Sequence, residues 1–338
     1  MCAEDNATYR RFLIAVAFSA STFFFLFWMS PNAFRYRTYL GDYLIFWRAG
    51  AGWPLYVDLH HLPFAYPPTS LFLLRPFGLL PFWWSLAAWT VVGMGLLWLS
   101  AKRLVGARIA WLGLLTATCL WLALSGQISG FVIALIVAGV VDKRPWVKGL
   151  CFAAAGLIKP QALIAAPIAL LAERNYRAIG WGALFAGAIV ASSIAIWGAD
   201  LWVRWFHSFG AFHALLAERE MDRSDVGIAG LALKLGLPGW LFVLGIPLGV
   251  MAVWNSFRRR GTTDAERYAA FACGSVLMSP YTLGYDLAAL SIVSVAFLLD
   301  RERSINLWRA SAMIVSYVLT APGIVLMAYC LARKRQPA

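Results

Sequence analysis

The sequence predicts an all-α polytopic membrane protein. Hydrophobic residues make up 61% of the 338 residues and charged residues only 13%, whereas roughly a quarter of the residues in a soluble domain are charged. Long apolar runs recur from end to end, and short basic clusters separate them. A soluble chain of this length would need polar surfaces around each of its domains. This composition therefore indicates that lipid surrounds the protein.

The net charge of +13 is distributed in a way that excludes a nucleic-acid-binding protein. Basic clusters at regular intervals between apolar runs are typical of cytoplasmic loops, whereas a nucleic-acid site gathers its charge on one surface. We therefore expect no nucleic-acid partner. The clusters are Arg10–Arg11, Lys102–Arg103–Arg108, Lys143–Arg144–Lys148, Arg174–Arg177, Arg258–Arg259–Arg260, Arg301–Arg303 and Arg333–Lys334–Arg335.

Twelve apolar segments qualify as helices of one membrane domain that covers residues 1–338, and we expect about 10–12 transmembrane helices. The first segment is too long for a cleaved signal peptide and is predicted to remain. Several segments are short and form pairs joined by tight turns, which is acceptable where protein covers the helix ends. The last pair has an alternative interpretation, one helix kinked at Pro322. The segments are 12–30, 82–100, 109–124, 128–141, 148–158, 161–173, 178–197, 239–256, 268–280, 286–299, 307–319 and 322–332.

Two long loops, 31–66 and 199–238, follow from this alternation, and both are predicted to lie on the non-cytoplasmic side of the inner (plasma) membrane. With the N-terminus inside, most of the 29 Lys and Arg residues fall on the cytoplasmic side, as the positive-inside rule requires. Each loop contains aromatic and apolar residues at helical spacing, which predicts short interfacial helices. We expect these two loops to form the active-site face.

Four ionisable residues stand out, because each is flanked by apolar sequence on the non-cytoplasmic half of the chain: Asp42, Arg75, Lys159 and Asp286. Charged groups near the membrane interior are expensive and mark candidate functional sites. A carboxylate can take a proton from a hydroxyl, and a cation can hold a phosphate group. The alternative is that the four residues pair with one another or extend their charges to the interface.

The sequence gives no sign of a metal or cofactor site. The five cysteines lie at the N-terminus or inside apolar runs without a CxxC pair, which argues against a zinc site or a disulfide framework. No DxD motif lies in either long loop, and no soluble segment is long enough for a nucleotide-binding domain. We therefore predict no cofactor and no metal ligands.

Several motifs occur in a characteristic order: GDYLIFWRAG (41–50), FAYPPTSLFLLRPFGLLPF (64–82), SGQISGFVIALIVAG (125–139), AGLIKPQ (155–161) and SPYTLGYD (279–286). This order resembles glycosyltransferase family 87, the polyprenyl-phosphate-mannose-dependent mannosyltransferase-like proteins of the GT-C superfamily. The resemblance covers most of residues 38–290. It implies a GT-C-like helical bundle and an enzyme that moves a hexose, mannose in this family, from a polyprenyl-phosphate sugar to a lipid or glycan acceptor.

The resemblance also assigns roles to residues. It implies that Asp42 is the general base in a single displacement that inverts the anomeric centre. Lys159, which opens a non-cytoplasmic hairpin, and Arg75 are the cations expected to bind the donor phosphate. Asp286 either accepts a sugar hydroxyl or pairs with Lys159. The further residues expected to contact substrate are Tyr66, His60, His61, Gln127, Gln161 and Tyr285.

Two other functions share these features. A lipid or sugar transporter would also have charges within the membrane and broken helices, but such proteins commonly show paired repeats, and none is visible here. A noncatalytic cell-envelope subunit would tolerate Asp42→Asn, whereas the enzyme would not.

Overall fold

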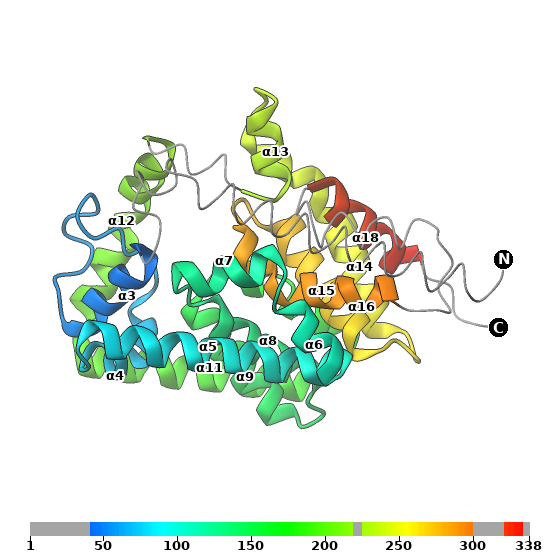
Figure 1. Cartoon of the computed structure of the whole chain (residues 1–338), viewed down its shortest axis with the longest axis horizontal. Helices are drawn as coiled ribbons and strands as arrows, with labels where there is room; N and C mark the ends of the chain where they lie inside the picture. The colour runs from blue at the N-terminus through cyan, green and yellow to red at the C-terminus, as the bar shows by residue number, and fades with distance from the viewer. Residues whose placement is uncertain (1–40, 219–224, 300–320, 334–338) are drawn as a thin grey trace.

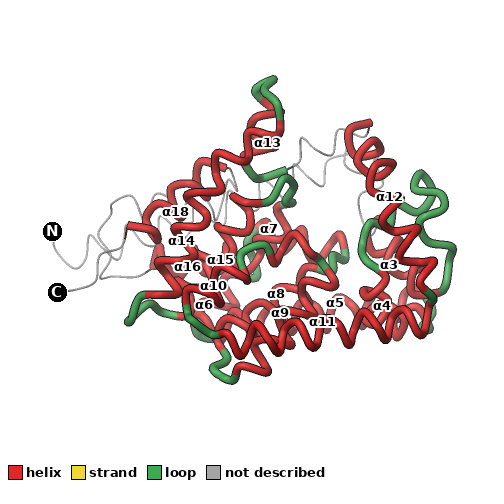
Figure 2. Tube along the Cα trace, turned by 180° about the vertical axis from the view of Figure 1, so that it is seen from behind, coloured by secondary structure: helices red, strands yellow, loops and turns green. Residues whose placement is uncertain are grey.

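The computed structural model describes residues 41–218, 225–299 and 321–333. Within these ranges the chain is helical and contains no strand (Figure 2). The predicted helices 12–30 and 307–319 lie outside the described residues, as do the loop segments 31–40 and 219–224. The described helices confirm the predicted all-α fold.

Among the described residues, three helices are long and apolar enough to cross a membrane. They are α5 (Phe82–Val105), α11 (Tyr176–Trp197), and the continuous segment formed by η4 (Gly239–Gly245) and α14 (Ile246–Arg258). A fourth span results if the bent pair formed by α6 (Ala107–Gly113) and α7 (Ala117–Ser125) counts as one. Few residues of α11 are buried in the protein, as expected for a helix that faces lipid. The protein is therefore a multi-pass membrane protein.

Shorter helices complete the bundle. The antiparallel pair α8 (Ser129–Val141) and α9 (Pro145–Ile158) packs between α5 and α11. Further α-helices of the described ranges are α4 (Leu71–Gly78), α10 (Ala166–Ala172), α13 (Ile228–Lys234), α15 (Asp264–Met278), α16 (Ala288–Leu299) and α18 (Ala321–Arg333). Single-turn 3₁₀ helices are η1 (Pro68–Ser70), η2 (Pro160–Leu163) and η5 (Gly284–Leu287).

The predicted helix 109–124 is wrong as a single straight helix, because α6 and α7 meet at an angle of 68°. At the end of α6, a Cβ on Gly113 would lie 2.5 Å from the Ile292 side chain. This close contact between α6 and α16 fixes α6 in place, and Thr116 then caps the turn by donating its hydroxyl to the Gly113 carbonyl at 2.8 Å. The predicted segment 161–173 is likewise divided into η2 and α10.

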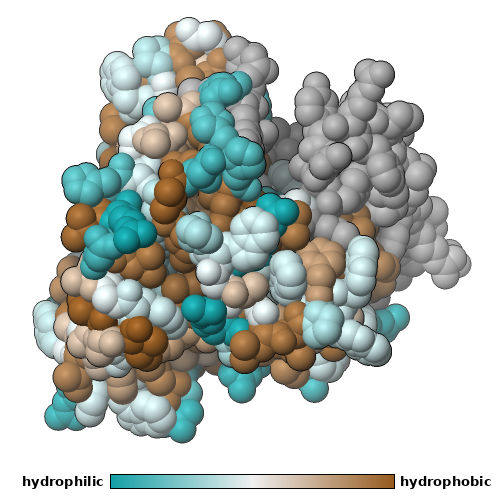
Figure 3. All heavy atoms as spheres, turned by 90° about the vertical axis from the view of Figure 1, so that its left-hand side faces the viewer, coloured by the Kyte–Doolittle hydropathy of each residue, from teal (hydrophilic) through white to brown (hydrophobic). Residues whose placement is uncertain are grey.

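Both long loops contain the helices that their aromatic spacing predicts. These are α3 (Gly41–Ala51) and α12 (Ala199–Glu218), which lie at the same end of the molecule as α4 (Figure 1). The indole of Trp205 on α12 donates to the Ala65 carbonyl at 3.0 Å, so the two loops are in contact. Seen from this end, polar and apolar residues are interspersed (Figure 3).

The bundle has two chemically different ends. At one end lie α3, the α7–α8 turn and the α9–η2 turn. At the other end lie the α8–α9 turn, the α10–α11 turn and the end of α14, and these contain Lys143, Arg174 and Arg258. A helix rises about 1.5 Å per residue, so the 13 residues of α8 separate the two ends by about 20 Å.

Candidate active site

A cavity of about 190 Å³ lies at the end of the bundle formed by α3, α9 and the 281–285 loop. It contains six residues that the sequence predicts as site residues. These are Asp42, Tyr66, Gln127, Lys159, Gln161 and Tyr285. Phe212 and Leu215 of α12 line the same cavity, so both predicted loops contribute to it.

Asp42 lies in the first turn of α3, where the positive end of the helix dipole favours a carboxylate. Its Oδ2 accepts a hydrogen bond from the Gln127 side-chain amide. Burial raises the pKa of Asp42 to about 6, while the bond from Gln127 and the charge of Lys159 oppose that rise. A carboxyl group with this pKa is ionised at neutral pH and still basic enough to take a proton.

Gln127 reaches Asp42 because the chain reverses sharply between α7 and α8. Gly126 adopts a left-handed conformation (φ 65°), and a Cβ there would lie 2.6 Å from Cβ of Tyr43 on α3. Only glycine meets both requirements. Gln127 is 3% exposed, and its Oε1 has no hydrogen-bond partner among the described residues. That oxygen can accept a hydrogen from a hydroxyl group in the cavity.

Lys159 lies at the end of α9, where Pro160 stops the helix, because the residue before a proline avoids the helical conformation. Its ammonium group donates to the Asp286 carboxylate and to Ser129 Oγ, the latter at 3.3 Å. It also lies 5.1 Å from the centre of the Tyr285 ring. The interpretation that Asp286 pairs with Lys159 is thus the one the structure shows.

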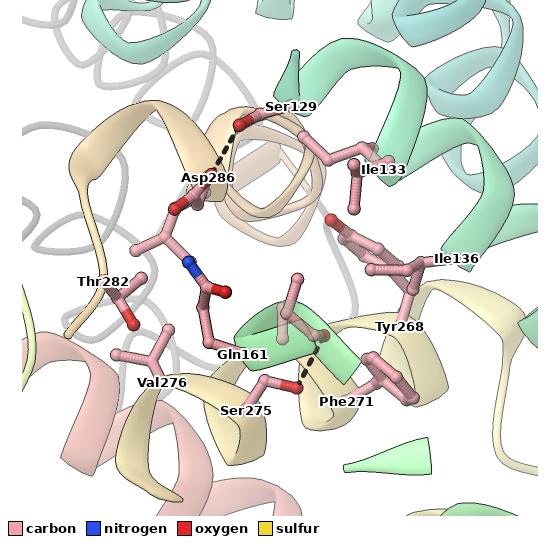
Figure 4. Close-up of a pocket in the computed structure, with 14 residues that line it drawn as sticks. Ser129, Ile133, Ile136, Gln161, Tyr268, Phe271, Ser275, Val276, Thr282 and Asp286 are labelled. Atoms are coloured by element: carbon pink, nitrogen blue, oxygen red, sulfur yellow. Dashed lines mark hydrogen bonds between the residues drawn. The ribbon is translucent and has the colours of Figure 1, made fainter. Parts of the chain in front are cut away.

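A second, smaller cavity of about 40 Å³ lies on the far side of this ion pair, between α8 and α15 (Figure 4). Asp286 and Gln161 point into it, and Ser129 donates to Asp286 at 2.5 Å. Gln161 lines both cavities. The Lys159–Asp286 pair therefore separates the larger cavity from a chamber that is mainly apolar.

Tyr66 is held at the cavity wall by the loop that precedes α4. The Tyr56 hydroxyl donates to the Tyr66 carbonyl at 2.5 Å, and Phe46 packs edge-on against the Tyr66 ring. Burial, together with the charges of Asp286 and Asp42, raises the pKa of Tyr66 well above its usual value. Tyr66 therefore stays a neutral hydroxyl that can donate a hydrogen bond.

Three predicted site residues lie outside both cavities. Arg75 donates to the Gly50 carbonyl at 3.0 Å, so its guanidinium fastens α4 to the end of α3. His60 and His61 lie on an exposed turn around Asp58, and His61 Nδ1 is 2.6 Å from the Asp58 carboxylate. These two histidines share a loop with Tyr66, but they are exposed and line neither cavity. Within the described ranges no three His, Cys, Asp or Glu residues are grouped as metal ligands.

Comparison with known proteins identifies the family. A model of glycosyltransferase family 87 matches residues 64–280. The chain belongs to this family. An alpha-(1->3)-arabinofuranosyltransferase from Corynebacterium glutamicum is 27% identical over 306 residues, which cover 80% of this chain and 69% of that protein. No solved structure matches. The protein is thus a membrane glycosyltransferase.

In this family 87 glycosyltransferase, the sequence did not reveal two polar residues that organise the site. Ser129 bridges Lys159 and Asp286, and the only signal for it was its place in the SGQISG motif. Asp225 is buried and accepts backbone N–H groups of Gly227 at 2.8 Å and Thr282 at 2.9 Å. It thereby fixes the loop that leads to Tyr285. Its role depends on a contact between segments far apart in the chain, which no local pattern predicts.

Proposed function

We propose that this glycosyltransferase moves a sugar from a polyprenyl-phosphate donor to a hydroxyl group of a lipid or glycan acceptor, with Asp42 as the general base. The observation that carries this proposal is the larger cavity, where a basic carboxylate and a buried ammonium group line the same space. Its neutral hydrogen-bonding groups, Gln127, Gln161 and Tyr66, suit the hydroxyl groups of a sugar.

The reaction is a single displacement. The acceptor oxygen attacks the anomeric carbon of the donor as its proton passes to an Asp42 oxygen, and the bond between the anomeric carbon and the phosphate oxygen breaks. The polyprenyl phosphate leaves with the bonding electrons. Attack opposite to the leaving group inverts the anomeric centre. Because Oδ2 of Asp42 accepts from Gln127, the other carboxylate oxygen is the one available to the acceptor.

Lys159 acts on the leaving group. An ammonium group has three hydrogens; Asp286 and Ser129 take two of them, and the third is left for a phosphate oxygen. The growing negative charge on the phosphate is stabilised most strongly where water is excluded, and Lys159 is only 3% exposed. Donor phosphate binding is therefore assigned to Lys159, and Arg75 is assigned to holding α3.

The transferred sugar has two candidates. The family resemblance favours mannose, and the relative named as an arabinofuranosyltransferase favours arabinofuranose. A hexose and a pentofuranose differ in ring size and in the exocyclic hydroxyl groups that Gln127 and Tyr66 would meet. Parallel transfer assays with polyprenyl-phosphate mannose and polyprenyl-phosphate arabinofuranose distinguish the two.

The site is proposed to face away from the cytoplasm. The opposite end of the bundle contains the basic turns with Lys143, Arg174 and Arg258, and such turns are typical of the cytoplasmic side. The cavity lined by Asp42 and Lys159 and the loop with Asp58 and His60 then lie on the periplasmic or exterior side.

The test compares two matched carboxylate variants. Asp42→Asn keeps the shape of the side chain and removes its basicity, so transfer from a polyprenyl-phosphate sugar should fall by about 10²–10⁴. Asp58→Asn alters an exposed carboxylate on the neighbouring turn and should leave the rate unchanged. A folded Asp42→Asn protein with full transfer activity would show that Asp42 is not the general base.

A further inference from the structure

A second polar cavity lies at the end of the bundle opposite to Asp42. Its volume is about 640 Å³, and the ends of α8, α10 and α14 and the starts of α9 and α15 surround it. Six cationic and three acidic side chains line it. They are Lys143, Lys148, Arg174, Arg258, Arg260 and Arg267, and Asp142, Glu173 and Asp264.

The floor of this basic cavity contains an incompletely bonded guanidinium. Lys148 donates to Glu173 at 2.7 Å and satisfies that carboxylate, whereas Arg267 Nη1 lies 3.7 Å from the other Glu173 oxygen, too far for a hydrogen bond. Nε of Arg267 is buried and has no hydrogen-bond partner among the described residues. A buried donor without a partner costs about 1–3 kcal/mol. The Arg267 side chain as a whole is 26% exposed and lines the cavity, so the remaining N–H groups of its guanidinium are available to an anion there.

The rim adds positive charge that the described part of the chain does not neutralise. Lys143, Arg174, Arg258 and Arg260 lie around the opening, and none forms an ion pair with a described residue. Arg174 follows the C-cap of α10 in a left-handed conformation (φ 55°). The bond from the Asn175 N–H to the Leu170 carbonyl at 2.9 Å closes the helix there and fixes where Arg174 begins. A geometry of several guanidinium groups around one space matches the oxygen atoms of a phosphate group.

We propose that this basic cavity binds a phosphate group, and that its source is the headgroup of an anionic phospholipid. The long helix α11 begins beside the cavity, and α5 and α14 end in basic turns on the same side, which places the cavity at the level where headgroups lie. Basic pockets between transmembrane helices bind such lipids. By the helical rise of α8, the site lies about 20 Å from the proposed catalytic cavity, so it is separate from donor binding.

The test titrates purified protein in a neutral detergent with a short-chain phosphatidylglycerol, with the matching phosphatidylcholine and with inorganic phosphate, and follows thermal stability. Phosphatidylglycerol should raise the midpoint at far lower concentration than phosphatidylcholine. The double variant Arg174→Gln/Arg260→Gln should bind phosphatidylglycerol about 25-fold more weakly, because each basic side chain near a headgroup contributes roughly a factor of five.

The double variant Lys102→Gln/Arg108→Gln is the control, because it removes two charges at the same end of the bundle outside the cavity. It should bind as the unaltered protein does. Equal weakening in both double variants, or equal responses to the two lipids, would overturn the proposal. Protection by inorganic phosphate with no preference for phosphatidylglycerol would support the phosphate site and overturn the lipid source.

Discussion

The two carboxylates near the proposed catalytic cavity are held in different ways. Asp286 is in direct contact with the ammonium group of Lys159, whereas Asp42 is in contact with the neutral amide of Gln127. A carboxylate beside a cation is a poor base, because the ion pair stabilises its charged form. Asp42 has no such ion-pair partner among the described residues, and its pKa is raised to about 6. This difference in environment supports Asp42, and not Asp286, as the base.

The pH dependence of the rate follows from this pKa. Asp42 accepts a proton only when it is ionised, so kcat/KM should be constant above about pH 7 and fall about tenfold per pH unit below about pH 6. The hydrogen bond from Gln127 lowers the pKa of Asp42. Gln127→Met should therefore move the acidic limb of the profile to higher pH. An acidic limb that stays in place in this variant would contradict the assignment of the limb to Asp42.

Lys159→Met should affect both stability and donor binding. The substitution leaves the largely buried Asp286 carboxylate without its cation, and breaking such a pair costs about 3–5 kcal/mol. Thermal unfolding should show this loss. The double variant Lys159→Met/Asp286→Asn removes both charges and should recover most of the stability.

The same double variant separates structure from function. If Lys159 holds the donor phosphate, the stable double variant should still show a higher KM for the polyprenyl-phosphate sugar. A double variant with the KM of the unaltered enzyme would show that Lys159 serves the fold alone. The sequence by itself suggested only a loss of donor binding, because it left open which residue pairs with Lys159.

At the scale of elements, the position of Asp42 depends on a backbone contact between α3 and α4. A Cβ on Gly78 would overlap the Gly50 carbonyl carbon, and a Cβ on Gly50 would overlap the Leu74 carbonyl oxygen. Arg75 reinforces the contact through its bond to the Gly50 carbonyl. The orientation of α3 is thus set by main-chain atoms, which cannot move aside as a flexible side chain can.

Gly78→Ala should separate these two helices. We expect a loss of about 1–3 kcal/mol in unfolding free energy, typical of overpacking, and a lower kcat because Asp42 shifts. Gly95→Ala is the control, because Gly95 lies in α5 with no atom within 4 Å of an added Cβ. Thermal denaturation and transfer assays on both variants check this. Equal behaviour of the two variants would show that the α3–α4 contact is unimportant.

Some helices could be predicted from the sequence and others could not, and the reason is physical. Apolar runs and basic turns report directly on burial in lipid, so α8, α9 and α11 begin and end within a few residues of their predicted bounds. The bend between α6 and α7 depends on Gly113 meeting Ile292, a contact between distant segments. The placement of Arg75 and the partnership of Ser129 with Asp286 likewise required the folded structure. The sequence offered the Lys159–Asp286 pair as one of two alternatives, but it did not indicate the partners of Arg75 and Ser129.

At the scale of the whole molecule, the proposed topology can be tested with cysteine labelling in a Cys2→Ser background. The native residues Cys119, Cys151, Cys273 and Cys330 are buried, so they should react slowly with an impermeant maleimide. His60→Cys, on the exposed turn near the catalytic cavity, should be labelled in intact cells. Lys143→Cys, at the rim of the basic cavity, should be labelled only after the membrane is opened. The reverse pattern would refute the proposed orientation.

The shortness of α8 and α9 affects whether the donor sugar is transferred to the acceptor or lost to water. At the rise of an α-helix, α11 extends for about 33 Å, which is comparable to the hydrocarbon core of a bilayer, whereas α8 extends for only about 20 Å. Because these helices end together beside the basic cavity, Lys159 lies roughly 12 Å below the level that the other end of α11 reaches. Hydrolysis of the activated donor competes with transfer wherever bulk solvent enters. A reaction centre recessed by that depth meets little bulk solvent, which favours transfer to the acceptor over loss of the sugar to water.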